Sequence, residues 1–76
     1  MSLIINTAAI IANYNPTLAN LFINQPLRRV DLAYAFAAGF AKNEYGDIHP
    51  VAMLVIRAAY FDRDERQSTT TARLTA

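Results

Sequence analysis

The most apolar stretch of the chain reads Ala33-Tyr34-Ala35-Phe36-Ala37-Ala38-Gly39-Phe40-Ala41. It contains no charged side chain and mixes small residues with aromatic ones. A helix that is apolar around its whole circumference must be covered on all sides. We therefore expect this segment to form the centre of the fold, with the rest of the chain packed around it.

The length of the chain, 76 residues, predicts one small domain. A domain of this size buries only about 60% of the surface that its unfolded chain exposes. Small domains compensate with disulfides, metal ions or self-association. The sequence has no cysteine and one histidine, His49, so a disulfide is excluded and a metal site built by one chain is disfavoured. We therefore expect a homodimer or a higher oligomer.

Charged residues are sparse, at 17% of the chain against roughly 25% in ordinary soluble domains, and positions 1–27 contain none. Such a chain exposes apolar surface that another chain can share. The apolar runs are interrupted by Asp31 and Arg57 before they reach the ~20 residues of a membrane span. Because a basic leader is also lacking, we expect a cytoplasmic protein, in the host cytoplasm if its source is a phage, with no membrane partner.

The uncharged N-terminal part predicts two short helices. Apolar residues recur at spacings of three and four over 3–13, although a short strand over 2–6 is a competing interpretation. Asn15 is a favourable N-cap, and Pro16 suits the first helical position because its missing N–H would be unpaired there anyway. The second helix therefore runs from Pro16 to about Asn24.

Two longer helices follow. Pro26 opens the third, which runs to about Lys42–Glu44, and Pro50 opens the fourth, which runs to about Arg66. Gly46 lies between them and can adopt the left-handed conformation that ends a helix. The two helices are therefore expected to form a helical hairpin.

Charges near the ends of these helices indicate how they pair. Arg28 and Arg29 lie in a first turn, and acidic residues lie in a last turn, so both oppose the helix dipole. An antiparallel hairpin would bring them together, with Arg28 opposite about Glu65 and Asp31 opposite Asp62 or Arg63. The functional alternative is an arginine pair presented to an acidic or phosphate-bearing partner. The same register sets Ala35, Ala38 and Gly39 against Val55, Ala58 and Ala59.

Catalytic patterns are absent from the sequence. Only Glu44, Asp47 and His49 bring acids close to a histidine, and two of them could contact one metal ion. A turn whose polar residues cap the fourth helix is the more economical interpretation, with Asp47 or His49 as the cap. Phosphate-binding loops, nucleophile elbows and zinc spacings are not found. We therefore expect no enzyme, no cofactor and no metal.

Nucleic-acid binding is disfavoured by the balance of seven basic and six acidic residues. The last helix interleaves Arg57, Arg63 and Arg66 with acids, which a helix in a DNA groove should not carry. A dimer could still pool basic residues on one face, and this alternative stays open. The residues concerned are Arg28, Arg29, Lys42 and Arg57.

Protein binding is the function that the composition favours. Neutral amides on an apolar surface suit an interface, because charged residues are depleted at interface cores. Of the four tyrosines, Tyr34 and Tyr60 are expected in the core, whereas Tyr14 and Tyr45 lie beside turns and could anchor a partner. The candidate partner-binding residues are Tyr14, Asn20, Asn24, Arg28, Arg29 and Tyr45.

The sequence therefore predicts an all-α fold of four helices, with two short N-terminal helices packed on a longer antiparallel hairpin. Residues 1–66 form the domain, and the Ser/Thr-rich segment 67–76 forms a flexible tail. The expected function is a non-enzymatic protein-binding module. Its small size is typical of phage or mobile-element accessory proteins that inhibit or adapt a larger host complex. The alternatives are a structural protein that self-associates or joins a larger particle, and a small dimeric nucleic-acid binder.

Overall fold

The computed structural model describes the backbone of residues 2–40 and 49–75, and the side chains of 2–40 and 49–68. These residues form helices and no strand, which confirms the all-α class and excludes the strand considered for 2–6. The elements are α1 (Leu3–Ala12), α2 (Pro16–Asn24), the 3-10 turn η1 (Pro26–Arg28), α3 (Arg29–Ala38) and α4 (Pro50–Thr75).

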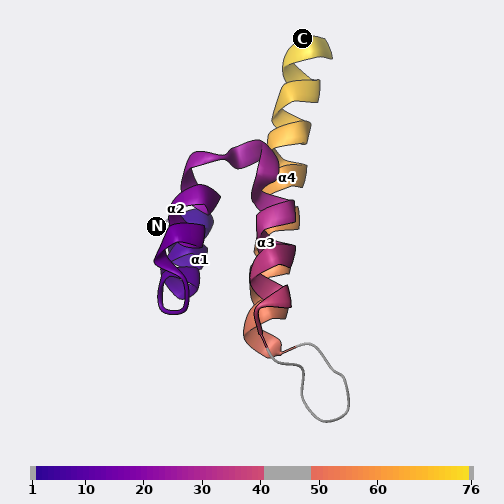
Figure 1. Ribbon diagram of the computed structural model, residues 1–76. Coiled ribbons are helices and arrows are strands. Elements are labelled where there is room, and N and C mark those ends of the chain that lie inside the picture. The colour runs from indigo at the N-terminus through magenta and orange to yellow at the C-terminus, as the bar shows by residue number, and fades with distance from the viewer. Residues whose placement is uncertain (1, 41–48, 76) are drawn as a thin grey trace.

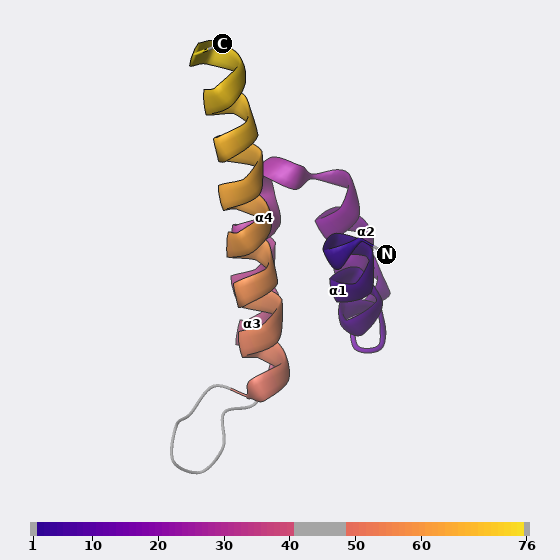
Figure 2. The same ribbon diagram turned by 180° about the vertical axis from the view of Figure 1, so that it is seen from behind.

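The helices are arranged as two pairs (Figures 1 and 2). The short helices α1 and α2 lie side by side, and η1 connects them to α3, which runs antiparallel to α4. Helix α4 is the longest element, and its C-terminal part extends well past the start of α3. The molecule is correspondingly elongated, with extents of 50 × 25 × 20 Å.

Local capping explains where the first two helices begin. The Ser2 side chain accepts a hydrogen bond from the Ile4 amide at 3.2 Å. Asn15 Oδ1 accepts one from the Leu18 amide at 3.0 Å, and Pro16 follows directly as the first residue of α2. The start predicted for α2 is therefore confirmed, because both residues act through interactions within a single turn.

The hydrophobic core lies between the two helix pairs. Each helix contributes small or branched residues, and Phe22 and Ile11 are among the largest side chains that are fully buried. Thr7 is the one buried polar side chain among the described residues, and its hydroxyl donates to the Leu3 carbonyl at 2.7 Å. The core cluster comprises Ile4, Ala8, Ile11, Ala19, Phe22, Leu32, Ala33, Phe36, Val55, Ile56 and Ala59.

The segment that starts at Ala33 is covered on one side only. Ala33 and Phe36 are buried, whereas Tyr34, Ala35, Ala38 and Gly39 are exposed. The prediction that this segment is covered all round is therefore wrong, as is the close packing predicted for Ala35, Ala38 and Gly39. One short chain supplies only α4 and the α1–α2 pair as cover, so the remaining side of α3 faces outward. Position 41 lies outside the described residues.

The bounds of the longer helices also differ from the prediction. Pro26 opens a 3-10 turn instead of an α-helix, and α3 ends at Ala38, with Gly39 as its C-cap. The predicted turn at Gly46 lies outside the described residues. Helix α4 continues past Arg66 to Thr75, because no glycine or proline interrupts it. That residues 67–76 are flexible stays a prediction.

Candidate interaction surfaces

An ion-pair cluster connects α3 to α4 at the end where α2 leads into α3. Asp62 Oδ2 on α4 accepts from Arg29 Nη1 at 3.1 Å and from Arg66 Nε at 2.9 Å. The side chains of Arg29 and Asp62 are only 11% and 15% exposed. Partial burial makes these contacts stronger than an ion pair in open solvent. The carboxylate of Asp62 therefore holds two arginines from different elements.

The Arg29 side chain also caps the C-terminal end of α2. Its Nε donates to the Phe22 carbonyl at 2.8 Å, and its Nη2 donates to the Ile23 carbonyl at 3.0 Å. The last carbonyls of a helix have no partner within the helix and carry the negative end of its dipole. The guanidinium lies 5.9 Å from the centre of the Phe22 ring as well. Arg29 is thus occupied inside the fold, although the sequence named it as a candidate partner-binding residue.

The other charged residues at this end form local contacts. Arg66 Nη2 donates to the Pro26 carbonyl at 2.9 Å, and the exposed Arg28 donates to Gln25 Oε1 at 3.0 Å. Arg63 pairs with Asp64 at 3.2 Å, and its guanidinium lies 4.7 Å from the centre of the Tyr60 ring. The predicted meeting of arginines with acids is therefore confirmed for Arg29, which pairs with Asp62. Arg28 contacts Gln25 and not Glu65, and Arg63 pairs with Asp64 and not with Asp31.

A shallow apolar groove of about 320 Å³ runs along the outer side of the α1–α2 pair. Ile5 and Ile23 line it and remain 56% and 41% exposed. Asn20, one of the candidate partner-binding residues, lies in its wall, and Asn24 is exposed at the last position of α2. None of the residues that line the groove is charged.

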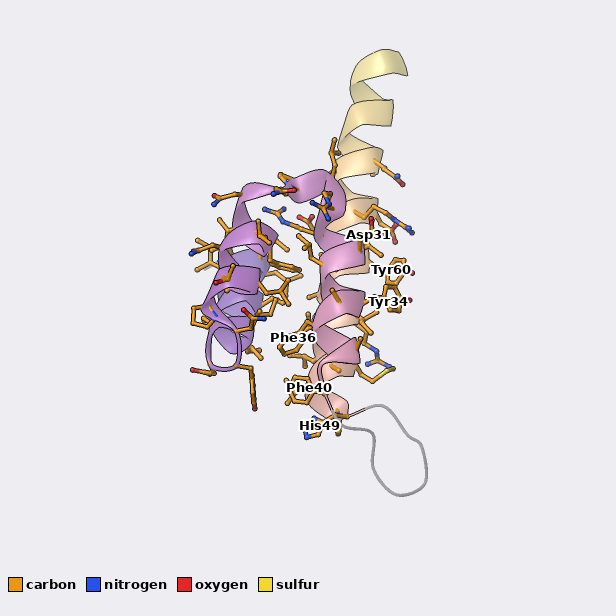
Figure 3. The ribbon with its side chains drawn as sticks, in the orientation of Figure 1. Asp31, Tyr34, Phe36, Phe40, His49 and Tyr60 are labelled. Carbon is orange, nitrogen blue, oxygen red and sulfur yellow. The ribbon has the colours of Figure 1, made fainter. Side chains whose placement is uncertain are left out.

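Of the two predicted tyrosine anchors, the structure describes only Tyr14. Tyr14 is 59% exposed, as expected, but its ring also lies edge-on against Phe40, with centroids 4.8 Å apart. Tyr45 lies outside the described residues. Phe36 and Phe40 point toward the α1–α2 pair (Figure 3). The Tyr14 ring also lies 6.0 Å from the ring of the buried Phe36, so Tyr14 contacts the core and still offers an exposed surface.

Tyr34 and Tyr60 form a pair on the opposite side of α3 and α4 (Figure 3). Their hydroxyl oxygens lie 3.0 Å apart, and their rings meet edge to face. Tyr34 is 48% exposed, so the prediction that it belongs to the core is wrong. Tyr60 is half-buried and packs against the core cluster, as predicted. The hydrogen bond with Tyr60 raises the pKa of Tyr34 above its ordinary value of 10.0.

A second groove, of about 350 Å³, lies between α1 and α4, and it was not predicted. Leu3, Leu54 and Phe61 form its exposed apolar wall, with exposures of 44%, 54% and 58%. Arg57 lies at its edge and also lines an adjoining groove with Met53. The sequence shows that positions 54, 57 and 61 share one helix face, but it does not show that α1 forms the other wall of the groove.

Metal binding finds no support in the described part of the chain, where no group of acids, histidines and cysteines could hold an ion. His49 Nδ1 accepts from the Val51 amide at 3.1 Å, as expected of a residue that caps α4, and its ring contacts Phe40. Glu44 and Asp47, the other members of the predicted acid–histidine group, lie outside the described residues.

None of the described helices has the length and apolar content needed to span a bilayer. Comparison of the chain with family models, with curated proteins and with solved structures found no match. The surfaces described above are therefore the features from which function is inferred.

Proposed function

We propose that this chain is a small non-enzymatic protein-binding module that acts as a homodimer or higher oligomer. The observation that carries the proposal is the exposed apolar surface of the α1–α2 pair, which combines Ile5 and Ile23 with the amides of Asn20 and Asn24. Surfaces of this kind suit interface cores, where charged residues are depleted and amides can hydrogen-bond.

The partner is expected to be a protein that offers an apolar helix or edge to the α1–α2 groove. Nonpolar side chains would fill the groove between Ile5 and Ile23, and Asn20 would pair with backbone groups at its rim. We infer that the chain acts in the cytoplasm on a larger host complex, as accessory proteins of phages and mobile elements do. Its small size supports this inference.

The test uses the chain as bait in a host lysate, followed by calorimetry with the purified partner. Ile23→Glu places a charge in the groove and should weaken binding by about tenfold or more. Leu27→Glu is the matched control, because Leu27 is 90% exposed and does not line the groove. Equal binding by both variants, with helicity unchanged, would contradict a role for the groove.

A second candidate function is self-assembly or incorporation into a larger particle. It is supported by the groove between α1 and α4, which leaves apolar surface exposed on another side of the same molecule. Light scattering over a hundredfold concentration range separates the two functions. A structural protein should grow in mass with concentration, whereas a binding module should stop at one defined oligomer.

Nucleic-acid binding remains the weakest of the candidates. Arg29, which a dimer would need to expose, contacts Asp62 and two carbonyl groups within the fold. An affinity that falls steeply with salt, and falls further in Arg28→Ala, would favour this function over protein binding.

A further inference from the structure

Helix α4 presents one exposed face that combines apolar and charged residues. Leu54, Arg57, Phe61 and Asp64 follow one another at spacings of three and four, which places them on one side of the helix, and all of them are exposed. The face continues in both directions to Pro50 and Ser68, which are exposed as well. The groove between α1 and α4 opens onto this face.

Arg57 is unusual among the cations of this surface. Within the described residues it forms no hydrogen bond or ion pair, whereas Arg28, Arg29 and Arg63 each do. Its surroundings are apolar, because Leu54 and Phe61 line the groove on either side of it. A partner that covered these residues would leave the guanidinium buried and unpaired unless it supplied an acid, since an uncompensated buried charge is costly.

The chain itself carries a suitable acid on the same face. Asp64 lies seven residues after Arg57, which is about two helical turns and a rise of about 10 Å. Asp64 is accessible, because its side chain is 67% exposed even though it pairs with Arg63. The face therefore has a cation at one end, an anion at the other and the ring of Phe61 between them.

Two copies of such a face match when their α4 helices lie antiparallel. Arg57 of each copy then comes opposite Asp64 of the other, so one twofold axis creates both ion pairs. Phe61 lies close to the axis in this register and meets the Phe61 ring of the second copy. This is the self-complementary contact that a twofold interface requires, with an aromatic centre and charged flanks as in stable interfaces.

We propose that the exposed face of α4 is the dimer interface, in which Arg57 of each copy pairs with Asp64 of the other around the Phe61 rings. The inference rests on the proposed self-association and specifies its face, its symmetry and its register. It leaves the groove of the α1–α2 pair open for a different protein, so one molecule can dimerise and bind a partner at the same time.

Charge reversal tests the register directly. In Arg57→Glu two acids face each other across the interface, and in Asp64→Arg two arginines do, so each variant alone should dimerise about tenfold or more weakly than the natural chain. A mixture of the two variants should form a heterodimer, because both contacts are then attractive: one is the natural pair of Arg57 with Asp64, and the other joins the new acid to the new arginine. Mass measured by light scattering behind size exclusion reports all three samples.

Asp31→Arg is the matched control, since Asp31 is exposed but belongs to α3 and not to the face of α4. Circular dichroism is used to check that each variant retains its helices. A natural chain that stays monomeric would overturn both the self-association and this interface. A natural dimer that both reversals leave intact, or a mixture that stays monomeric, would overturn the interface alone and leave self-association standing.

Discussion

The two sides of this molecule use charge in opposite ways. Where α2 leads into α3, the arginines and acids are engaged with one another and with helix ends, and the Arg29 side chain is almost fully covered. The α1–α2 pair has no charged side chain and leaves apolar residues such as Ile5 and Ile23 exposed. Charge therefore fixes how the helices are connected, whereas the uncharged surface is the one that we propose for a partner protein.

Arg29 shows why the charged side is stable despite its unfavourable sequence position. A cation in the first turn of α3 opposes the dipole of that helix. The same guanidinium lies at the C-terminus of α2, where it donates to two carbonyls and benefits from the dipole of α2. The ion pair with Asp62 adds a contact to α4. One side chain thus joins three helices.

The largest predicted effect distinguishes two arginines that are adjacent in the sequence. Arg29→Ala leaves Asp62 and two carbonyls without this donor, and should lower the free energy of unfolding by about 2–3 kcal/mol, measured by urea denaturation. Arg28→Ala removes an exposed hydrogen bond to Gln25 and should change it by less than about 0.5 kcal/mol. Equal losses of unfolding free energy in the two variants would show that the buried contacts of Arg29 contribute nothing to stability.

A smaller effect is expected on the uncharged side, where hydrogen bonds at helix ends replace ion pairs. Asn15→Ala removes the side chain that accepts from the Leu18 amide, and should cost about 1 kcal/mol in the same measurement. Asn20→Ala is the control, because Asn20 is exposed within α2 and caps no helix. If the two substitutions lowered the free energy of unfolding equally, the start of α2 would depend on packing and not on its cap.

Features that act within one turn were readable from the sequence. The N-cap at Asn15 and the proline after it need no knowledge of the rest of the fold. The ion pair of Arg29 with acidic residues of α4 could also be predicted, because charges that oppose their own helix dipole are favourable only when they pair with an opposite charge. In both cases the residue type alone restricts the possible partners.

Features that depend on which side of a helix is covered were not readable. The apolar residues around Tyr34 suggested burial on all sides, but only the number and placement of neighbouring helices decide which side faces outward. The groove between α1 and α4 depends on the same placement, since Leu3 and Phe61 are far apart in the sequence. The continuation of α4 past Arg66 reflects the absence of a helix breaker, which a search for apolar periodicity does not register.

The smallest predicted effect concerns the pair formed by Tyr34 and Tyr60, which lies on neither of the two sides compared above. Because the pKa of Tyr34 is raised in the folded state, the contact stabilises the fold below the ordinary pKa of 10.0, and this contribution is lost as the pH rises through the higher folded pKa. Titration of tyrosinate absorbance should show one tyrosine that ionises late in the natural chain. Tyr60→Phe should return its pKa toward the ordinary value, since Tyr34 then loses its partner, whereas Tyr14→Phe should leave the late ionisation in place. Identical late ionisation in the natural chain and in Tyr60→Phe would mean that the hydrogen bond does not persist in solution, and that α3 and α4 are held together at this level by the core and the charged side alone.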